Sequence, residues 1–97
     1  MLAYSPCLGY GPVMNSNQRK TLEAVFTDPV SPSIAWADIE GLLKAVGCVL
    51  TEGAGSRVKF EKDGKVAAFH RPHPRKETKR YAVRLAREYL TKLEIQP

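Results

Sequence analysis

Two histidines, His70 and His73, lie three positions apart, and several cations lie near them in the sequence. An imidazole titrates close to neutral pH, so each can donate or accept a proton under physiological conditions. Arg57, Lys59 and Arg71 can supply positive charge. Metal-independent cleavage of an RNA phosphodiester needs a base for the 2′-hydroxyl proton, an acid for the leaving oxygen and cations for the charge that builds on the phosphate. These residue types suffice for that chemistry.

We expect His70 to be the principal acid–base group, Arg57 to stabilise phosphate charge and His73 to be the second proton-transfer group. Arg57 cannot serve as an ordinary base, because a guanidinium keeps its proton at physiological pH. His73 lies between Pro72 and Pro74, where a structural role in ordering the link is an open alternative. For His70 and Arg57 the alternative is plain surface charge.

A metal site is not expected at these histidines. Two histidines without a cysteine or carboxylate at ligand spacing leave most of a coordination shell empty. The two cysteines, Cys7 and Cys48, form no C-x-x-C pair and are too few for a disulfide framework, so we expect free thiols in a reducing cytosol. The sequence therefore predicts a cytoplasmic protein without a metal or another cofactor.

Positive charge is concentrated in the second half of the chain. Residues 1–53 contain three Lys/Arg and five Asp/Glu, whereas residues 54–97 contain twelve and five. Such asymmetry is typical of a protein with a polyanionic partner, although a basic face kept for solubility is an open alternative. Besides the three candidate catalytic residues, the cations that we expect to contact RNA are Lys59, Arg71, Arg75, Lys76, Lys79, Arg80, Arg84 and Arg87.

A β-hairpin is expected to position Arg57 and His70. Residues 56–61 alternate between apolar and charged side chains, Asp63-Gly64 is a favoured two-residue turn, and a second strand follows over residues 66–70. If Asp63 and Gly64 form the loop, Lys62 faces Lys65, Phe60 faces Ala67, Val58 faces Phe69 and Arg57 faces His70. Arg57, Lys59, Ala68 and His70 then share the solvent-facing side. A three-residue loop or a bulge would shift this pairing by one residue.

A helix is expected to follow the proline-rich link. It should start between Pro74 and Thr78 and run to about Leu93. Successive residues 100° apart place Lys76, Arg80, Arg84 and Arg87 on one half of this helix. The other half, which should pack on the sheet, contains Tyr81, Ala82, Leu85, Ala86, Tyr89, Leu90 and Leu93.

The first half of the chain predicts two helices and a strand. Residues 17–26 have apolar side chains at helical spacing before Asp28-Pro29, which ends the pattern. A second apolar stripe follows Trp36, which we expect to be a core or packing residue, and stops at Gly47. Ser33 is the expected cap of this helix. Residues 48–50 form a short strand candidate. The predicted fold is α+β, in the order helix, helix, three-stranded antiparallel sheet, helix.

The sequence resembles the HicA family of bacterial toxins over roughly residues 34–93. The resemblance lies in Gly55-Ser56-Arg57-Val58-Lys59-Phe60, the Phe69-His70-Arg71-Pro72-His73-Pro74 segment, the final helix and the helix before Gly47. It implies a fold similar to a double-stranded RNA-binding domain, and a ribonuclease that cuts mRNA until a HicB antitoxin blocks it. Where the family usually carries its catalytic histidine this chain has Arg57, so proton transfer would have to move, and His70 faces that position.

These observations predict a leader over residues 1–13, a helical extension and connection over 14–33 and a HicA-like domain over 34–97. The leader lacks a basic start and contains two prolines and two glycines, so it does not resemble a secretory signal. We expect a toxin of a HicA/HicB-type type II toxin–antitoxin system that binds and cleaves mRNA. A non-catalytic RNA-binding or regulatory module on the same fold, and a domain that binds an acidic protein partner, are the alternatives.

Overall fold

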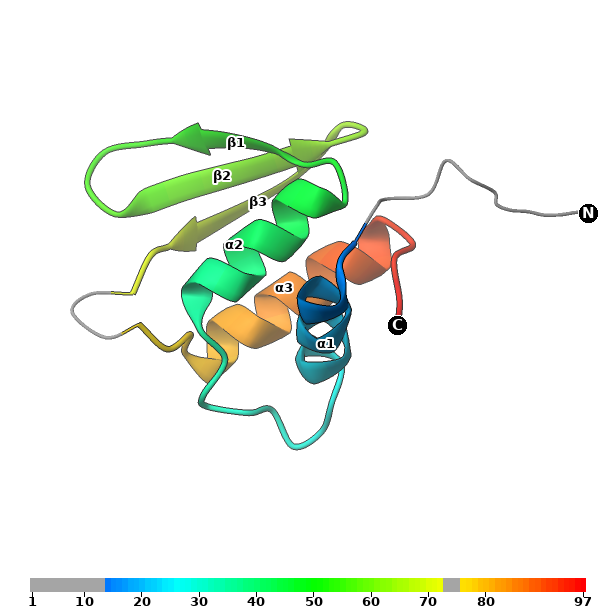
Figure 1. Ribbon diagram of the computed structural model, residues 1–97. Coiled ribbons are helices and arrows are strands. Elements are labelled where there is room, and N and C mark those ends of the chain that lie inside the picture. Colours follow the sequence, from blue (N-terminus) through cyan, green and yellow to red (C-terminus); the bar gives the residue numbers. More distant parts are fainter. Residues whose placement is uncertain (1–13, 73–75) are drawn as a thin grey trace, which may run out of the picture.

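The computed structural model describes residues 14–72 and 76–97 (Figure 1). A three-stranded antiparallel sheet, in the order β1-β2-β3, forms one layer, and the helices lie on one side of it. The predicted α+β fold is confirmed, and α2-β1-β2-β3-α3 follows the element order of a double-stranded RNA-binding domain. The elements are α1 (Ser16–Val25), α2 (Trp36–Ala45), β1 (Val49–Glu52), β2 (Arg57–Lys62), β3 (Lys65–His70) and α3 (Arg80–Lys92).

The β2–β3 hairpin has the predicted register. Arg57 pairs with His70, Val58 with Phe69, Phe60 with Ala67 and Lys62 with Lys65. The turn is the expected two-residue loop, in which Asp63 and Gly64 have φ values of 54° and 77°. Positive φ at both central positions matches the right-handed twist of the strands, which explains why an Asp-Gly pair closes the hairpin without a bulge.

The inner face of the sheet packs on α2 through an aromatic cluster. Trp36 opens α2, and its ring centroid lies 5.3 Å from that of Phe69 and 6.4 Å from that of Phe60. Phe60 and Phe69 meet edge to face at 5.8 Å. The expected apolar stripe of α2 is buried, since Ile39, Leu42, Leu43 and Val46 all belong to the core. Trp36 is therefore a core residue, as predicted.

Helix α1 packs against α2 and α3 and contributes to the same core (Figure 1). Leu22 and Val25 on α1, and Val30 in the following loop, are buried. Asn15 caps the helix by accepting a hydrogen bond from the Gln18 amide, and the Gln18 side chain accepts one from the Asn15 amide. The helical extension is therefore an integral layer of the fold.

Two predicted helix starts are wrong for the same reason. Ser33 does not cap α2: the N-cap is Ala35, which makes no side-chain cap bond, and the Ser33 hydroxyl lies beside that of Ser31. α3 begins at Arg80, later than the predicted 74–78, so Lys76 precedes the helix. Residues 34–36 and 76–78 pair instead, because the Trp36 amide donates to the Lys76 carbonyl and the Thr78 amide to that of Ile34.

Tyr81 was expected on the packing side of α3, but 57% of its surface is exposed. Tyr81 lies in the first turn of α3, next to the chain segment that links β3 to the helix, whereas Tyr89 two turns later is buried as predicted. The predicted leader, residues 1–13, lies outside the described residues, as does Cys7. Cys48 is a buried free thiol, and none of the helices in residues 14–72 and 76–97 is long and apolar enough to cross a membrane.

Candidate active site and nucleic-acid interface

The outer face of the hairpin presents Arg57 and His70 side by side. Opposed residues of an antiparallel pair point to the same face, and Arg57, Lys59, Ala68 and His70 are all exposed on the side away from the helices. A shallow groove of about 430 Å³ runs over this face from Thr51 to His70. The sequence prediction of a charged, titratable cluster on the hairpin is confirmed by the register.

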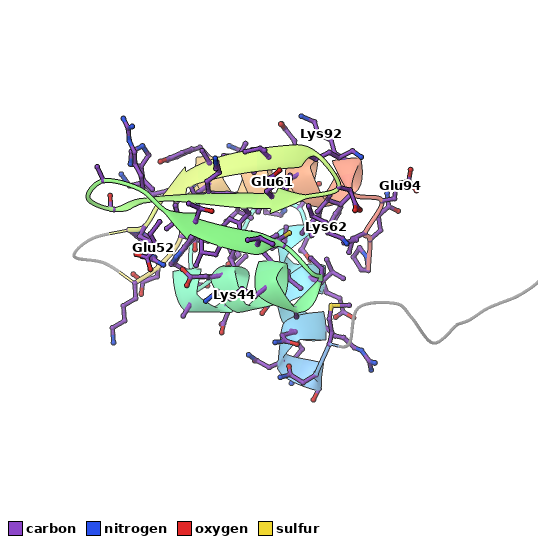
Figure 2. All side chains as sticks on the ribbon, turned by 90° about the horizontal axis from the view of Figure 1, so that it is seen from above. Lys44, Glu52, Glu61, Lys62, Lys92 and Glu94 are labelled. Carbon is purple, nitrogen blue, oxygen red and sulfur yellow. The ribbon has the colours of Figure 1, made fainter. Side chains whose placement is uncertain are left out.

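Arg71, the residue after His70, is held by protein carboxylates. Its Nε and Nη2 atoms donate to the two oxygens of Glu40 at 3.1 and 3.3 Å, and Nη1 donates to Glu52 at 3.0 Å. Trp36 Nε1 also donates to Glu40, at 2.8 Å. In Figure 2, Glu52 lies at the end of the sheet away from Lys62. These contacts join α2, β1 and the end of β3 next to His70.

The charge state of Glu40 follows from these neighbours. Partial burial by itself raises the pKa of Glu40, but the hydrogen bonds from Arg71 and Trp36 and the Arg71 charge outweigh it and hold the pKa below its usual value. Hydrogen bonds to Glu40 and Glu52 in turn raise the pKa of Arg71. Arg71 was predicted to contact RNA, and the structure gives its guanidinium a bidentate partner inside the protein instead of an open position.

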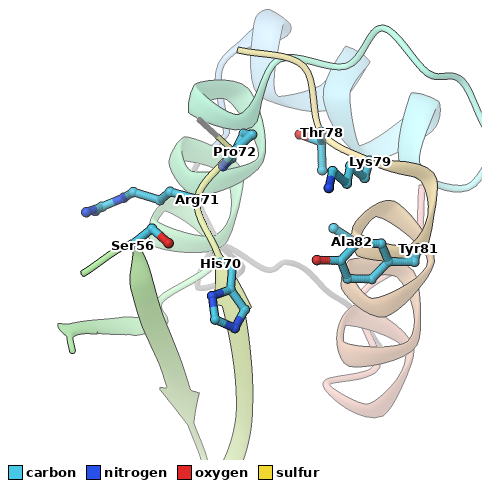
Figure 3. Close-up of a pocket in the computed structure, with 8 residues that line it drawn as sticks. All are labelled: Ser56, His70, Arg71, Pro72, Thr78, Lys79, Tyr81 and Ala82. Atoms are coloured by element: carbon cyan, nitrogen blue, oxygen red, sulfur yellow. The ribbon is translucent and has the colours of Figure 1, made fainter. Parts of the chain in front are cut away.

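A pocket of about 180 Å³ separates the end of β3 from the first turn of α3 (Figure 3). His70 borders both this pocket and the groove on the sheet. In Figure 3 the Lys79 and Tyr81 side chains extend from the α3 side toward the strand, while the Arg71 guanidinium points away. The lining residues are Ser56, His70, Arg71, Pro72, Thr78, Lys79, Tyr81 and Ala82.

Three polar residues of this lining were missed by sequence reasoning: Ser56, Thr78 and Tyr81. Ser56 directly precedes Arg57 and was assigned to the strand pattern, and Tyr81 was assigned to the core by its helical phase. The pairing of residues 76–78 with 34–36 sets where α3 begins, and this long-range contact leaves no periodic signal in the sequence. The Ser56 position next to the two strand ends was the one available clue.

The predicted cations of the last helix divide into two groups. Lys76, Lys79, Arg80 and Arg84 are exposed, and Arg80 and Arg84 border a groove beside residues 29–32. Arg87 instead binds the end of α1: Nε donates to the Val25 carbonyl at 2.9 Å, Nη2 to the Thr27 carbonyl at 3.0 Å and Nη1 to Asp28 at 3.1 Å. His73 and Arg75 lie outside the described residues.

Other titratable groups serve the core. Burial raises the pKa values of the Cys48 thiol and the Tyr89 hydroxyl, which lie 3.8 Å apart, and Tyr89 also donates to the Lys65 carbonyl at 2.9 Å. Both groups stay neutral at physiological pH. Within residues 14–72 and 76–97 no three His, Cys, Asp or Glu residues group to hold a metal ion.

The fold and the exposed basic surface define a small α+β domain with the topology of a double-stranded RNA-binding domain. Comparison with known families adds the specific assignment. The family model described as the HicA toxin of bacterial toxin–antitoxin systems matches residues 36–90, which is more than half of the chain. The chain belongs to the HicA toxin family.

The match runs from the first residue of α2 into α3 and includes Arg57, His70 and the described pocket. Helix α1 lies before it. No curated protein and no solved structure matches the chain. Membership in a toxin–antitoxin family implies, in general, an antitoxin partner.

Proposed function

We propose that this chain is the toxin of a HicA/HicB-type pair, and that it binds mRNA and cleaves it by metal-independent endonucleolysis in the cytoplasm. The observation that carries the proposal is the pairing of His70 with Arg57 on an exposed, basic sheet face within a toxin family. A titratable group and a permanent cation lie next to each other there, where a polymer can reach both.

In the proposed reaction, neutral His70 takes the proton of a ribose 2′-hydroxyl. The 2′-oxygen then attacks the adjacent phosphorus, the bond from phosphorus to the 5′-oxygen breaks, and a 2′,3′-cyclic phosphate forms. The leaving 5′-oxygen receives a proton from a second group, for which His73 is the candidate. Arg57 stabilises the negative charge that builds on the phosphate oxygens. No external oxidant, metal or cofactor enters these steps.

The exposed cations supply the proposed RNA contacts. Lys59 is two residues from Arg57 on β2, Lys76 and Lys79 precede α3, and Arg80 and Arg84 lie in its first two turns. Each cation that neutralises a phosphate adds sequence-independent affinity by releasing counterions. Arg75 joins this set as a sequence-based candidate. Arg71 and Arg87 contribute mainly to the fold, because their guanidinium groups already have protein partners.

The test is RNA cleavage by the purified chain in excess chelator, with an end-labelled RNA. We expect His70→Ala to lower the cleavage rate by about 100-fold or more, the size of effect that general acid–base groups have. Lys92→Ala, an exposed cation at the far end of α3, is the matched control and should cleave at the parental rate. Equal rates for the parent and His70→Ala would show that the assignment of His70 is wrong.

A second function has one observation in its favour. Arg57 occupies the position at which the resembling family usually has its catalytic histidine, and arginine cannot exchange a proton at physiological pH. A non-catalytic RNA-binding or regulatory module would keep the basic surface without the reaction. The same assay separates the two: RNA binding without chelator-resistant cleavage supports this module. Growth arrest on expression, relieved by a co-expressed HicB-like neighbour, supports the toxin.

A further inference from the structure

We propose that the pocket between the end of β3 and the first turn of α3 is a binding site for a single phosphate group. The site differs from the Arg57 face of the hairpin and adds Ser56, Thr78 and Tyr81 to the residues that meet the ligand. The proposal depends on the proposed function only in one respect, namely that RNA is the polymer that supplies the phosphate.

Hydrogen-bond donors from three segments converge on this pocket. Ser56 precedes β2, His70 ends β3, and Lys79 and Tyr81 come from the start of α3. Figure 3 shows the Ser56 hydroxyl, the Lys79 ammonium and the Tyr81 hydroxyl on opposite sides of one space. None of the described residues that line it is a carboxylate. An anion with several oxygen acceptors, such as phosphate, matches such a set of donors.

The N-terminus of α3 faces the same space. α3 is 13 residues long, has no acidic residue in its first turn and has no side-chain cap at Lys79. The Ala82 and Val83 amides both donate to the Lys79 carbonyl at 3.0 Å. Among the described residues, no acceptor is found for the Arg80 and Tyr81 amides. Free amides and the positive end of the helix dipole together favour a bound anion.

Thr78 provides an independent observation in favour of a hydrogen-bonding ligand. Its side chain lines the pocket and is 1% exposed, yet its hydroxyl has no hydrogen-bond partner within residues 14–72 and 76–97. The other buried threonine, Thr21, donates to the Asn17 carbonyl at 3.1 Å, as buried hydroxyls normally do. The Thr78 amide is fixed by the Ile34 carbonyl at 2.7 Å, so the residue cannot readily turn away. An oxygen at the base of the pocket would satisfy this hydroxyl.

The size of the pocket favours one phosphate group over a larger anion. At about 180 Å³ it is smaller than the groove on the sheet face, which has about 430 Å³. A phosphate brings five heavy atoms, and His70 borders both this pocket and the groove on the sheet, where the rest of a polymer could continue. In RNA the source is either an internal phosphodiester, which has two non-bridging oxygens, or a terminal monoester, which has three.

The experiment follows backbone amides of the full chain by NMR while inorganic phosphate is added at constant ionic strength. We expect saturable shifts of the Arg80 and Tyr81 amides. Lys79→Gln should weaken binding about tenfold, as loss of one charge-assisted contact does. Thr78→Val keeps the shape of the side chain and should also weaken binding, while Lys92→Gln should bind as the parent. Uridine 5′-monophosphate and the dinucleotide UpU then compare a terminal phosphate with an internal one.

Sodium chloride producing the same shifts, or Lys92→Gln weakening binding as much as Lys79→Gln, would overturn the proposal. Because Lys79 is exposed, Lys79→Gln should fold, and it tests the pocket even if Thr78→Val does not fold. Chelator-resistant RNA cleavage is measured separately on the same samples. Saturable phosphate binding without cleavage leaves the pocket in place and contradicts the nuclease, whereas cleavage by a chain that binds no phosphate contradicts the pocket.

Discussion

Arg57 and His70 differ in what each can contribute to a reaction. The guanidinium carries a fixed charge, while the imidazole can exchange a proton, and the register of the hairpin brings the two onto one face. Arg71, one residue further on, has a third role. It holds the end of β3 to α2 and β1 through Glu40 and Glu52, and we interpret it as a positioning residue for His70.

Glu40 makes this role measurable. Its pKa is lowered in the folded chain, so the ion pair stabilises the fold above the ordinary pKa of a glutamate and this contribution is lost as pH falls through the lowered value. We expect Glu40→Gln to lower the free energy of unfolding by about 1–3 kcal/mol at pH 7. Urea unfolding at pH 7 and at about pH 3 should show the difference between parent and variant shrinking in acid.

Glu61→Gln is the matched control, because Glu61 is exposed and forms no ion pair with a described residue. Its effect should be small at both pH values. A Glu40→Gln chain as stable as the parent at pH 7 would show that the Arg71 contacts do not hold the strand end.

At the scale of elements, α3 combines an exposed basic face with a tie to α1. Arg84 is exposed beside the groove, whereas Arg87 donates three hydrogen bonds to the end of α1 and the loop after it. We expect Arg87→Gln to lower the free energy of unfolding by about 1–3 kcal/mol and to leave RNA affinity nearly unchanged. Arg84→Gln should leave stability unchanged and reduce the salt dependence of RNA binding by about one phosphate contact.

Urea unfolding and RNA titrations at several salt concentrations distinguish the two variants. If Arg87→Gln loses salt dependence and keeps its stability, the original prediction of Arg87 as an RNA contact is right and the structural role is wrong. Because the two arginines are on the same helix, the comparison controls for the helix itself.

The elements differ in how far sequence could predict them. The hairpin register followed from one local turn and one alternating pattern, and the apolar stripe of α2 followed from its period. The start of α3 did not, because it depends on the pairing of residues 34–36 with 76–78, which lie far apart in the chain. Thr78 and Tyr81 lie at the start of α3, so the pocket that they line could not be predicted either.

At the scale of the whole molecule, the family-matched region and the folded unit differ. The match begins at residue 36, but the core extends into α1 through Leu22 and Val25, which are 2% and 0% exposed. Sequence predicted an amphipathic helix there without indicating its partner. In the structure, α1 packs against α2 and α3.

Leu22→Ala tests whether α1 and the matched region unfold together. Removing a buried leucine side chain should lower the free energy of unfolding by about 2–5 kcal/mol, and the loss should appear in a single transition that also exposes Trp36. Glu23→Ala, on the exposed side of α1, should change little. Trp36 fluorescence and far-ultraviolet circular dichroism measured across the same urea series provide the two probes. Separate transitions would contradict a shared core.

The turn at Asp63 and Gly64 has a consequence for how this chain can vary. It lies at the opposite end of the hairpin from Arg57 and His70, yet the length of the turn sets the register that pairs these two residues. Substitutions on the outer sheet face can therefore accumulate without disturbing the pairing, while a single inserted residue in the loop would put another side chain opposite His70. In evolution or in protein engineering, an insertion in this turn should therefore disturb the site more than most substitutions on the outer sheet face.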